Sequence, residues 1–437
     1  MATLKAGAAV VDITPRGSQF LYGYPYVERY STGVHDPLFS SALYLSDGRT
    51  EVMFVANDSI FVGKHVAQRA RKRIAEAVGV PTGNIMITAT HTHSAPNTVD
   101  YVSCERDPVV PKADPKYVQL FEDGVVAAAL QAFDRAQPAR VGLAIADGTG
   151  VGTNRRDPSG PADPEVPVLM VKAMDSDEWI ACMVVYSMHP TVLHEDSKLV
   201  SGDFPGMTRL YLQQHVLGEG CPVLYHTGPE GNQSPRHVTK ANTFAEAERL
   251  GEMLGRAIAE VIPEITYTAS VSLESCQRFI DLPRRALPSV AEAAAKRERA
   301  LERLEHLRRT NAPRQETRTA ECDWFGAEET FTLAEAAEKG RLDAFYDACL
   351  PAEVQILKIG PWSFVGWPGE VFVEYALAVK QHYEDTFIIN LANGDLQGYI
   401  VTEEAALEGG YEASQALFGP ETGTLLVEAT IDLLDTP

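Results

Sequence analysis

The sequence predicts a mixed α/β fold, with a largely parallel central sheet flanked by helices and a helical insertion. Two observations carry this prediction. Apolar runs of strand length alternate with segments of helical periodicity along most of the chain, and polar side chains suited to chemistry follow several of the strands. The 437 residues are 45% hydrophobic and 22% charged, which is ordinary for a globular chain. Because neither a repeat nor a low-complexity linker interrupts the pattern, one domain over 1–437 is the simplest organisation.

The net charge of the chain argues against two classes of binding partner. With 38 basic and 60 acidic side chains the formal charge is −22, and such a surface repels phosphate backbones and anionic lipid head groups. We therefore expect neither a nucleic-acid partner nor a membrane partner. The first residues lack the pattern of a signal peptide, and no apolar run approaches the ~20 residues that span a bilayer.

The cysteines favour a reducing compartment. They are scattered and form no CxxC pair, which argues against a disulfide framework or a zinc ribbon. The six are Cys104, Cys182, Cys221, Cys276, Cys322 and Cys349. We expect buried free thiols and a cytoplasmic protein.

The first elements form a strand–helix–strand unit. Residues 42–57 have the pattern of a hairpin, 64–79 that of a helix, and 84–90 that of a buried strand. Strands joined through a helix run parallel, so His91 and His93 are expected just beyond the carboxyl end of a parallel strand. Open α/β sheets bind their ligands at that edge.

The alternation continues to the end of the chain. A second hairpin is expected over 166–188, joined by an acidic turn, and His189 follows its second strand. The other expected helices are 115–136, 204–218, 243–261 and 371–383, and the other expected strands are 139–147, 222–226, 268–280, 353–360, 362–370 and 386–393.

Residues 284–350 differ in character from the rest. A capping box from Ser289 to Glu292 opens a helix dense in Ala, Glu and Arg, whose thin leucine stripe is typical of a mostly solvated helix packed on one side. The following segment, 311–326, is polar and is expected to be irregular. We interpret the region as an insertion that either closes over a site as a lid or decorates the fold without a role in substrate access.

Polar groups recur at the same kind of place, directly after a strand. These groups are His91 with His93, His189, Ser234, Glu370 and Tyr399. Each alone has an ordinary structural explanation, but several on one edge favour a ligand site. Two neutral imidazoles and a carboxylate suit a tetrahedral zinc ion and leave a position for water or an oxygen ligand.

Six motifs in order resemble those of one known family. They are TATHTHSAP at 88–96, NRR at 154–156, MHPT at 188–191, GNQSPR at 231–236, PGE at 368–370, and tyrosines at 399 and 411. Together they resemble the catalytic domain of the neutral/alkaline non-lysosomal ceramidases, along nearly the whole chain.

The resemblance implies zinc-dependent hydrolysis of an N-acyl amide bond. By position, the zinc ligands of the family match His91, His189, Glu370 and Tyr399, and the residues around the scissile amide match His93, Arg155, Ser234 and Tyr411. His93 is then the acid–base group, and Arg155 and Tyr411 donate to the developing oxyanion. Two points stay open: Ser234 is either the nucleophile or a positioning donor, and either Arg155 or Arg156 faces the site.

The sequence also departs from the family pattern. Asn232 stands where the family loop usually carries an aspartate, and neither the signal peptide nor the C-terminal immunoglobulin-like domain of the secreted ceramidases is expected here. We therefore predict a compact soluble N-acyl substrate rather than ceramide.

Two alternatives from other classes remain. The same ligands suit a metal-dependent esterase, lactonase or phosphoesterase, and a non-catalytic, metal-free binding protein could retain the fold. The sequence contains no GxSxG elbow, Walker A loop or HExxH motif, which removes the commonest other hydrolase signatures.

Overall fold

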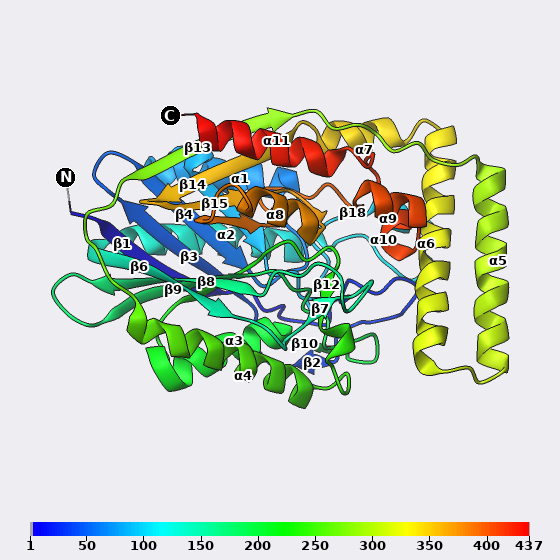
Figure 1. The fold of residues 1–437 in the computed structure, drawn as a ribbon, viewed down its shortest axis with the longest axis horizontal. Helices are drawn as coiled ribbons and strands as arrows, with labels where there is room; N and C mark the ends of the chain where they lie inside the picture. The colour runs from blue at the N-terminus through cyan, green and yellow to red at the C-terminus, as the bar shows by residue number, and fades with distance from the viewer. Residues whose placement is uncertain (1–2, 437) are drawn as a thin grey trace.

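The structure, a computed structural model, describes residues 3–436 and contains two packed sheets with helices on their outer faces (Figure 1). The larger sheet has the strand order β11 (Val223–Thr227), β9 (Trp179–Tyr186), β8 (Glu165–Ala173), β6 (Gln137–Asp147), β1 (Lys5–Asp12), β3 (Phe39–Ser46), β4 (Glu51–Asn57) and β5 (Ile85–Ala89). The smaller sheet has the order β13 (Leu273–Ile280), β14 (Ala352–Ile359), β15 (Trp362–Gly366) and β17 (Thr386–Ile389).

Burial on both faces explains the continuous apolar runs of the central strands. In β4, Val52 and Phe54 face the smaller sheet and pack with Phe364, whereas Met53 and Val55 belong to the cluster under the helices. A strand covered on both sides needs apolar residues at every position rather than at every second one.

Helices cover both outer faces. On the larger sheet these are α1 (Lys64–Val78), α2 (Pro115–Asp134), α3 (Asp203–Leu212) and α4 (Phe244–Val261). On the smaller sheet they are α7 (Leu342–Cys349), α8 (Val373–Lys380) and α11 (Thr422–Asp435). Two short helices, α9 (Glu403–Glu408) and α10 (Tyr411–Gln415), follow the smaller sheet. In residues 3–436 no helix is long and apolar enough to cross a membrane.

The mixed α/β class is confirmed, but the prediction of a largely parallel sheet is wrong. Of the seven neighbouring pairs in the larger sheet, five are antiparallel and two are parallel. Short turns such as the one between β3 and β4 can join only antiparallel strands. Parallel pairs arise where a helix crosses over, in β4–α1–β5, β9–α3–β11 and β15–α8–β17.

The region 284–350 is helical throughout most of its length. It holds α5 (Val290–Arg309), α6 (Arg314–Glu338) and α7, and α5 pairs with α6 at one end of the molecule (Figure 1). The capping box that opens α5 is confirmed. The expectation of an irregular segment at 311–326 is wrong, because α6 runs through it. Its polar residues are good helix formers, and Ala320 packs against Leu304 and Leu307 of α5.

Candidate metal centre and substrate pocket

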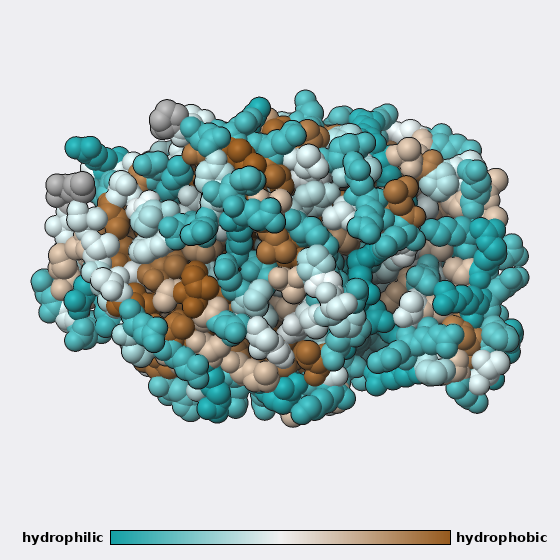
Figure 2. All heavy atoms as spheres, viewed as in Figure 1, coloured by the Kyte–Doolittle hydropathy of each residue, from teal (hydrophilic) through white to brown (hydrophobic). Residues whose placement is uncertain are grey.

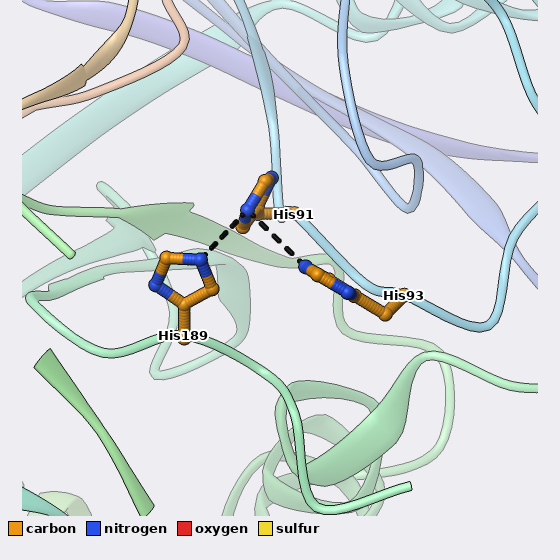
Figure 3. A group of neighbouring side chains, drawn as sticks. All are labelled: His91, His93 and His189. Atoms are coloured by element: carbon orange, nitrogen blue, oxygen red, sulfur yellow. Dashed lines mark hydrogen bonds between the residues drawn. The ribbon is translucent and has the colours of Figure 1, made fainter. Parts of the chain in front are cut away.

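Three imidazoles and one carboxylate converge at the carboxyl ends of the parallel strand pairs. His91 follows β5, His189 follows β9, and Glu370 begins β16 (Glu370–Val371), just after β15. The Nε2 atom of His91 lies 3.1 Å from Nε2 of His189 and 3.3 Å from Nε2 of His93 (Figure 3). Oε2 of Glu370 lies 3.3 Å from His91 Nε2 and 3.1 Å from His189 Nε2. The crossovers that create the parallel pairs therefore also assemble this cluster.

The outer ring nitrogens determine which atoms face inward. Each Nδ1 lies at hydrogen-bond distance from a backbone carbonyl, so each Nδ1 carries the proton and donates it. The acceptors are Ile60 for His91 at 2.9 Å, Glu230 for His189 at 2.8 Å and Gly23 for His93 at 3.2 Å. All three Nε2 atoms then present lone pairs to one another and to Glu370, which is the arrangement of metal-ligating histidines.

The cluster fits a zinc-sized cation. A tetrahedral ion with bonds of about 2.0–2.1 Å places its ligand atoms about 3.3 Å apart, close to the four separations found here. Among residues 3–436, the buried Oε2 of Glu370 finds no hydrogen-bond donor, because the nearby Nε2 atoms carry no proton. Four inward lone pairs repel one another unless a cation sits between them.

Local backbone conformation supports the close approach. His91 has a φ of 67°, a left-handed conformation that is uncommon for a residue with a side chain and occurs at functional sites. Gly23 has a φ of 117°, and a Cβ there would lie 2.3 Å from Nδ1 of His93. A Cβ on Gly231 would lie 2.7 Å from the carbonyl oxygen of Glu370. Both glycines therefore permit contacts that a larger residue would block.

The structure brings Tyr399 beside this cluster. β16 and β18 (Tyr399–Ile400) form a short parallel pair in which Glu370 and Tyr399 stand opposite each other. The Tyr399 ring is buried, with its centroid 6.3 Å from that of His189 and 6.0 Å from that of Tyr411. Both predicted tyrosines thus lie in the site region.

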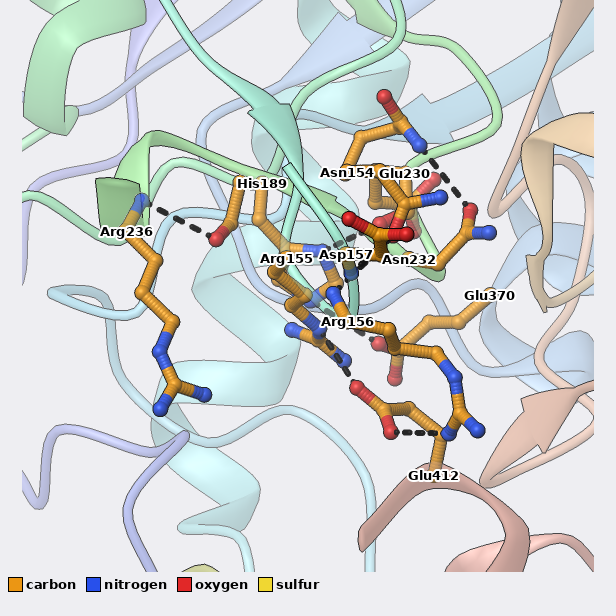
Figure 4. Close-up of polar contacts among 12 residues, drawn as sticks. Asn154, Arg155, Arg156, Asp157, His189, Glu230, Asn232, Arg236, Glu370 and Glu412 are labelled. Atoms are coloured by element: carbon orange, nitrogen blue, oxygen red, sulfur yellow. Dashed lines mark hydrogen bonds and ion pairs between the residues drawn. The ribbon is translucent and has the colours of Figure 1, made fainter. Parts of the chain in front are cut away.

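Arg155, rather than Arg156, offers a free donor to the centre. Its Nε donates to Glu412 at 2.8 Å, its guanidinium lies 5.0 Å from the Tyr399 ring centroid, and its Nη2 is buried without a partner in residues 3–436. Arg156 donates to Glu412 (Figure 4). It also donates to Glu408 and to the Gly409 carbonyl. Glu412 therefore accepts hydrogen bonds from both arginines. The unpartnered Nη2 favours Arg155 over Arg156 as the arginine that faces the site.

A large pocket lies in front of the cluster. It is lined by His93, Arg155, Ser234, Tyr399 and Tyr411, and α6 of the insertion contributes one wall. The residues from α6 are Arg318, Thr319, Cys322, Asp323 and Phe325. The hydroxyl of Ser234 accepts a hydrogen bond from the Arg236 backbone N–H at 3.2 Å and caps the short helical turn that follows.

The family profile described as neutral/alkaline non-lysosomal ceramidase, N-terminal, matches residues 4–223, which is half of the chain. The chain belongs to this family. His91, His93, Arg155 and His189 lie within the matched part, and the family predicted from the six motifs is confirmed.

Curated ceramidases are distant relatives. The neutral ceramidase of Pseudomonas aeruginosa is 24% identical over 310 residues, covering 64% of this chain and 45% of that protein. The neutral ceramidase of Drosophila pseudoobscura pseudoobscura is 24% identical over 238 residues, covering 51% of this chain and 34% of that protein. The chain therefore spans less than half the length of these relatives.

Solved ceramidase structures share the fold. The crystal structure of neutral ceramidase from Pseudomonas aeruginosa superposes with a TM-score of 0.77 at 20% identity, covering 99% of this chain and 75% of that one. A structure described as ceramidase complexed with C2 gives a TM-score of 0.75 at 18% identity, covering 98% and 74%.

The electrostatics of this ceramidase-family centre shift its groups in two directions: Glu370 and two of the imidazoles lose protons more readily, whereas at His91 burial is outweighed by the Glu370 carboxylate, which raises the pKa of that imidazole. Burial alone would raise the pKa of Glu370, but His91 and His189 outweigh it and hold that pKa well below its usual range. Burial, together with the two other imidazoles, lowers the pKa of His93 well below its usual value. Burial and, after it, the charge of Arg155 lower the pKa of His189 to about 4. A carboxylate and neutral imidazoles are the forms that bind metals.

Three acidic residues of the site were missed by sequence reasoning. Glu412 holds Arg155, Glu230 lies beneath the imidazoles, and Glu329 reaches from α6 into a small cavity that the ligand cluster also lines. Only Glu412 had a signal, since it directly follows the predicted Tyr411. Glu230 directly precedes the GNQSPR motif but is not part of it, and Glu329 lies on a helix without a family motif.

Proposed function

We propose that this chain is a zinc-dependent hydrolase that cleaves the N-acyl amide bond of a compact, soluble substrate. One observation carries the proposal: buried His91, His189 and Glu370 meet with inward lone pairs at the edge of a substrate-sized pocket. An amide carbonyl is a poor electrophile, so its hydrolysis needs an activated nucleophile, donors for the oxyanion and an acid for the leaving amine.

The proposed zinc ligands are His91, His189, Glu370 and Tyr399. Zinc bound there supplies Lewis acidity, which polarises the amide carbonyl and acidifies water. The backbone carbonyls of Ile60 and Glu230 orient the two imidazoles, as outer partners of ligating histidines do. Tyr399 stands opposite Glu370 in the β16–β18 pair and offers a phenol oxygen from the pocket side.

His93 is proposed to move the proton. Its Nδ1–H is engaged by the Gly23 carbonyl, so Nε2 is the atom that accepts a proton from water and returns it to the leaving nitrogen. Nη2 of Arg155 and the phenol of Tyr411 donate to the carbonyl oxygen as negative charge develops on it. Ser234 has no imidazole partner among the described residues, which favours a positioning role over that of a nucleophile.

The charged side chains of the pocket support a substrate with polar groups. Ten charged side chains line it: Arg155, Arg156, Asp157, Arg236, Arg318, Asp323, Glu374, Glu404, Glu408 and Glu412. A site for a long acyl chain would instead present continuous apolar surface. On the face drawn in Figure 2, the surface over α5 and α6 is mostly hydrophilic, and the largest hydrophobic cluster lies toward the opposite end of the sheet. We propose the insertion at 284–350 as a wall of this pocket within one catalytic domain.

A reducing compartment is part of the proposal. All six cysteines are free thiols in the structure, which supports the cytoplasm as the place of action.

A matched pair of substrates tests the activity. Purified, metal-loaded protein is assayed on an amide and an ester of the same small acyl group, before and after removal of the metal by a chelator. We expect turnover of the amide that disappears with the metal and returns with zinc. Turnover of the ester alone would establish an esterase, and intact folding without bound metal or turnover would establish a binding protein.

A further inference from the structure

A second carboxylate, that of Glu230, lies within reach of the metal centre. Glu230, His91 and Glu370 each offer a ligand atom within 4.8 Å of the other two, and all three residues are buried. Glu230 and Glu370 are drawn together in Figure 4. Neither the six motifs nor the family resemblance points to Glu230, which stands four residues before Ser234 in the loop after β11.

Glu230 belongs to the same centre rather than to a separate one. His91 is common to both candidate donor sets, and its Nδ1 is already bonded to the Ile60 carbonyl. Only Nε2 is left to bind a metal, and one nitrogen binds one ion. His91 therefore cannot be a ligand of two metal ions at once.

Glu230 reaches the centre without lining either cavity. Among residues 3–436, Tyr399 lines both the large pocket and the small cavity at the ligand cluster, whereas Glu230 lines neither. Its side chain is fully buried, and its own backbone carbonyl orients His189. Glu230 therefore does not compete with a substrate in the pocket.

One carboxylate oxygen of Glu230 lacks a partner. Asn390 donates its Nδ2–H to Oε2 at 2.7 Å, which fixes the orientation of the carboxylate. Oε1 is buried without a hydrogen-bond partner in the described chain. If Glu230 is ionised, an uncompensated negative charge is buried at Oε1. If it is protonated, an unpaired hydroxyl is buried there. Both forms are therefore unfavourable unless a cation binds at Oε1.

We propose that Glu230 is an additional ligand of the metal, binding through its unpartnered Oε1. The inference rests on the proposed function, because it requires the metal that the proposed reaction uses. Two carboxylates together neutralise a divalent cation, and Asn390 holds the second one in place.

Glu230→Gln tests the inference without an activity assay. The variant keeps the size of the side chain but replaces the charged oxygen with an amide. Zinc affinity is measured by competition with a chelator, and the cobalt-substituted protein is examined by visible absorption, which reports the number of ligands. Glu329→Gln is the matched control, since it removes a buried carboxyl near the same centre but outside ligand reach.

We expect Glu230→Gln to bind zinc at least about tenfold more weakly, the lower end of what even outer partners of ligands cost. We also expect its cobalt bands to differ from those of the parent protein, whereas Glu329→Gln matches the parent in both measurements. Unchanged cobalt bands in Glu230→Gln would overturn direct coordination, even with weaker binding. Thermal unfolding of the metal-free variants checks that each is folded.

The outcomes separate this inference from the proposed function. A parent protein that binds no metal contradicts the proposed function. A parent that binds one zinc tightly, with Glu230→Gln indistinguishable from it, contradicts only the role of Glu230.

Discussion

Arg155→Ala is the substitution that most directly probes the proposed oxyanion site. The guanidinium of Arg155 is held by two contacts: Nε donates to Glu412 at 2.8 Å, and the group lies 5.0 Å from the Tyr399 ring centroid. Its Nη2 atom is buried without a hydrogen-bond partner in residues 3–436. Nη2 is therefore a donor available to a substrate oxygen. Loss of one such donor costs about 2.7–4 kcal/mol of transition-state stabilisation, or about 10²–10³-fold in kcat.

Arg156→Ala is the matched control. Arg156 binds the same Glu412 from the neighbouring position, but its other contacts are to Glu408 and the Gly409 carbonyl, and it is partly exposed. Removing a partly exposed ion pair is expected to cost about 1 kcal/mol or less of folding stability. Because Arg156 has no part in the proposed oxyanion site, kcat should fall much less than in Arg155→Ala.

The assay is steady-state kinetics on a small N-acyl amide, with zinc content measured on the same preparations. We expect Arg155→Ala to retain zinc and lose kcat, with a much smaller loss in Arg156→Ala. Equal losses in the two variants, or a loss of zinc in Arg155→Ala, would refute the assignment of Arg155 as an oxyanion donor.

Three further predictions follow from the same geometry. His93→Ala should keep its zinc but lose about 10²–10⁴-fold in kcat, the contribution of a proton-transfer group; loss of zinc equal to that of His91→Ala would show that His93 is a ligand. When N-acetyl and N-palmitoyl versions of one amine are compared, the acetyl compound should have the higher kcat/KM, because each CH₂ that cannot be buried again loses about 0.8 kcal/mol of binding. A tenfold preference for the long chain would mean that the substrate is a lipid amide. Burial and Asp107 raise the pKa of Glu329 to about 8, so its carboxyl stays protonated in the folded state at a pH where it is ionised in the unfolded chain. The stability that the protonated Glu329 contributes should therefore be lost as the pH rises from about 4.5 to 8. In urea unfolding of metal-free protein, Glu329→Gln should lose less stability between pH 5 and pH 8 than the parent protein does; equal losses would contradict the assignment.

The order of elements was predictable because it depends on local signals. The helix α1 ends at Gly79, whose φ of 83° suits glycine, and β5 follows within a few residues, as the pattern of 64–90 predicts. Strand partners depend on contacts between distant segments, however. β1 pairs with both β3 and β6, and nothing in its own apolar pattern indicates either partner or its antiparallel direction.

The helix α6 illustrates a second limit. The segment 311–326 has no clear apolar stripe, yet it is helical because it packs against α5 and against α10 near the pocket. Tertiary packing decides such a segment, and local pattern does not.

The metal cluster was partly predictable for a physical reason. Residues that follow parallel strands share one edge of a sheet, so His91, His189 and Glu370 could be grouped before their distances were known. Glu230 and Glu412 could not, because they act from a loop and a short helix whose direction depends on the folded backbone. The ring orientation that places His93 Nε2 only 3.3 Å from His91 Nε2 was equally invisible in the sequence.

The most direct test of the account is the zinc content of the parent protein, His91→Ala and His189→Ala, measured by elemental analysis of purified, folded samples. The account predicts one zinc per chain in the parent protein, with both zinc and amide hydrolysis lost in each variant. Full zinc occupancy in both variants, or amide hydrolysis by a metal-free parent, would contradict it.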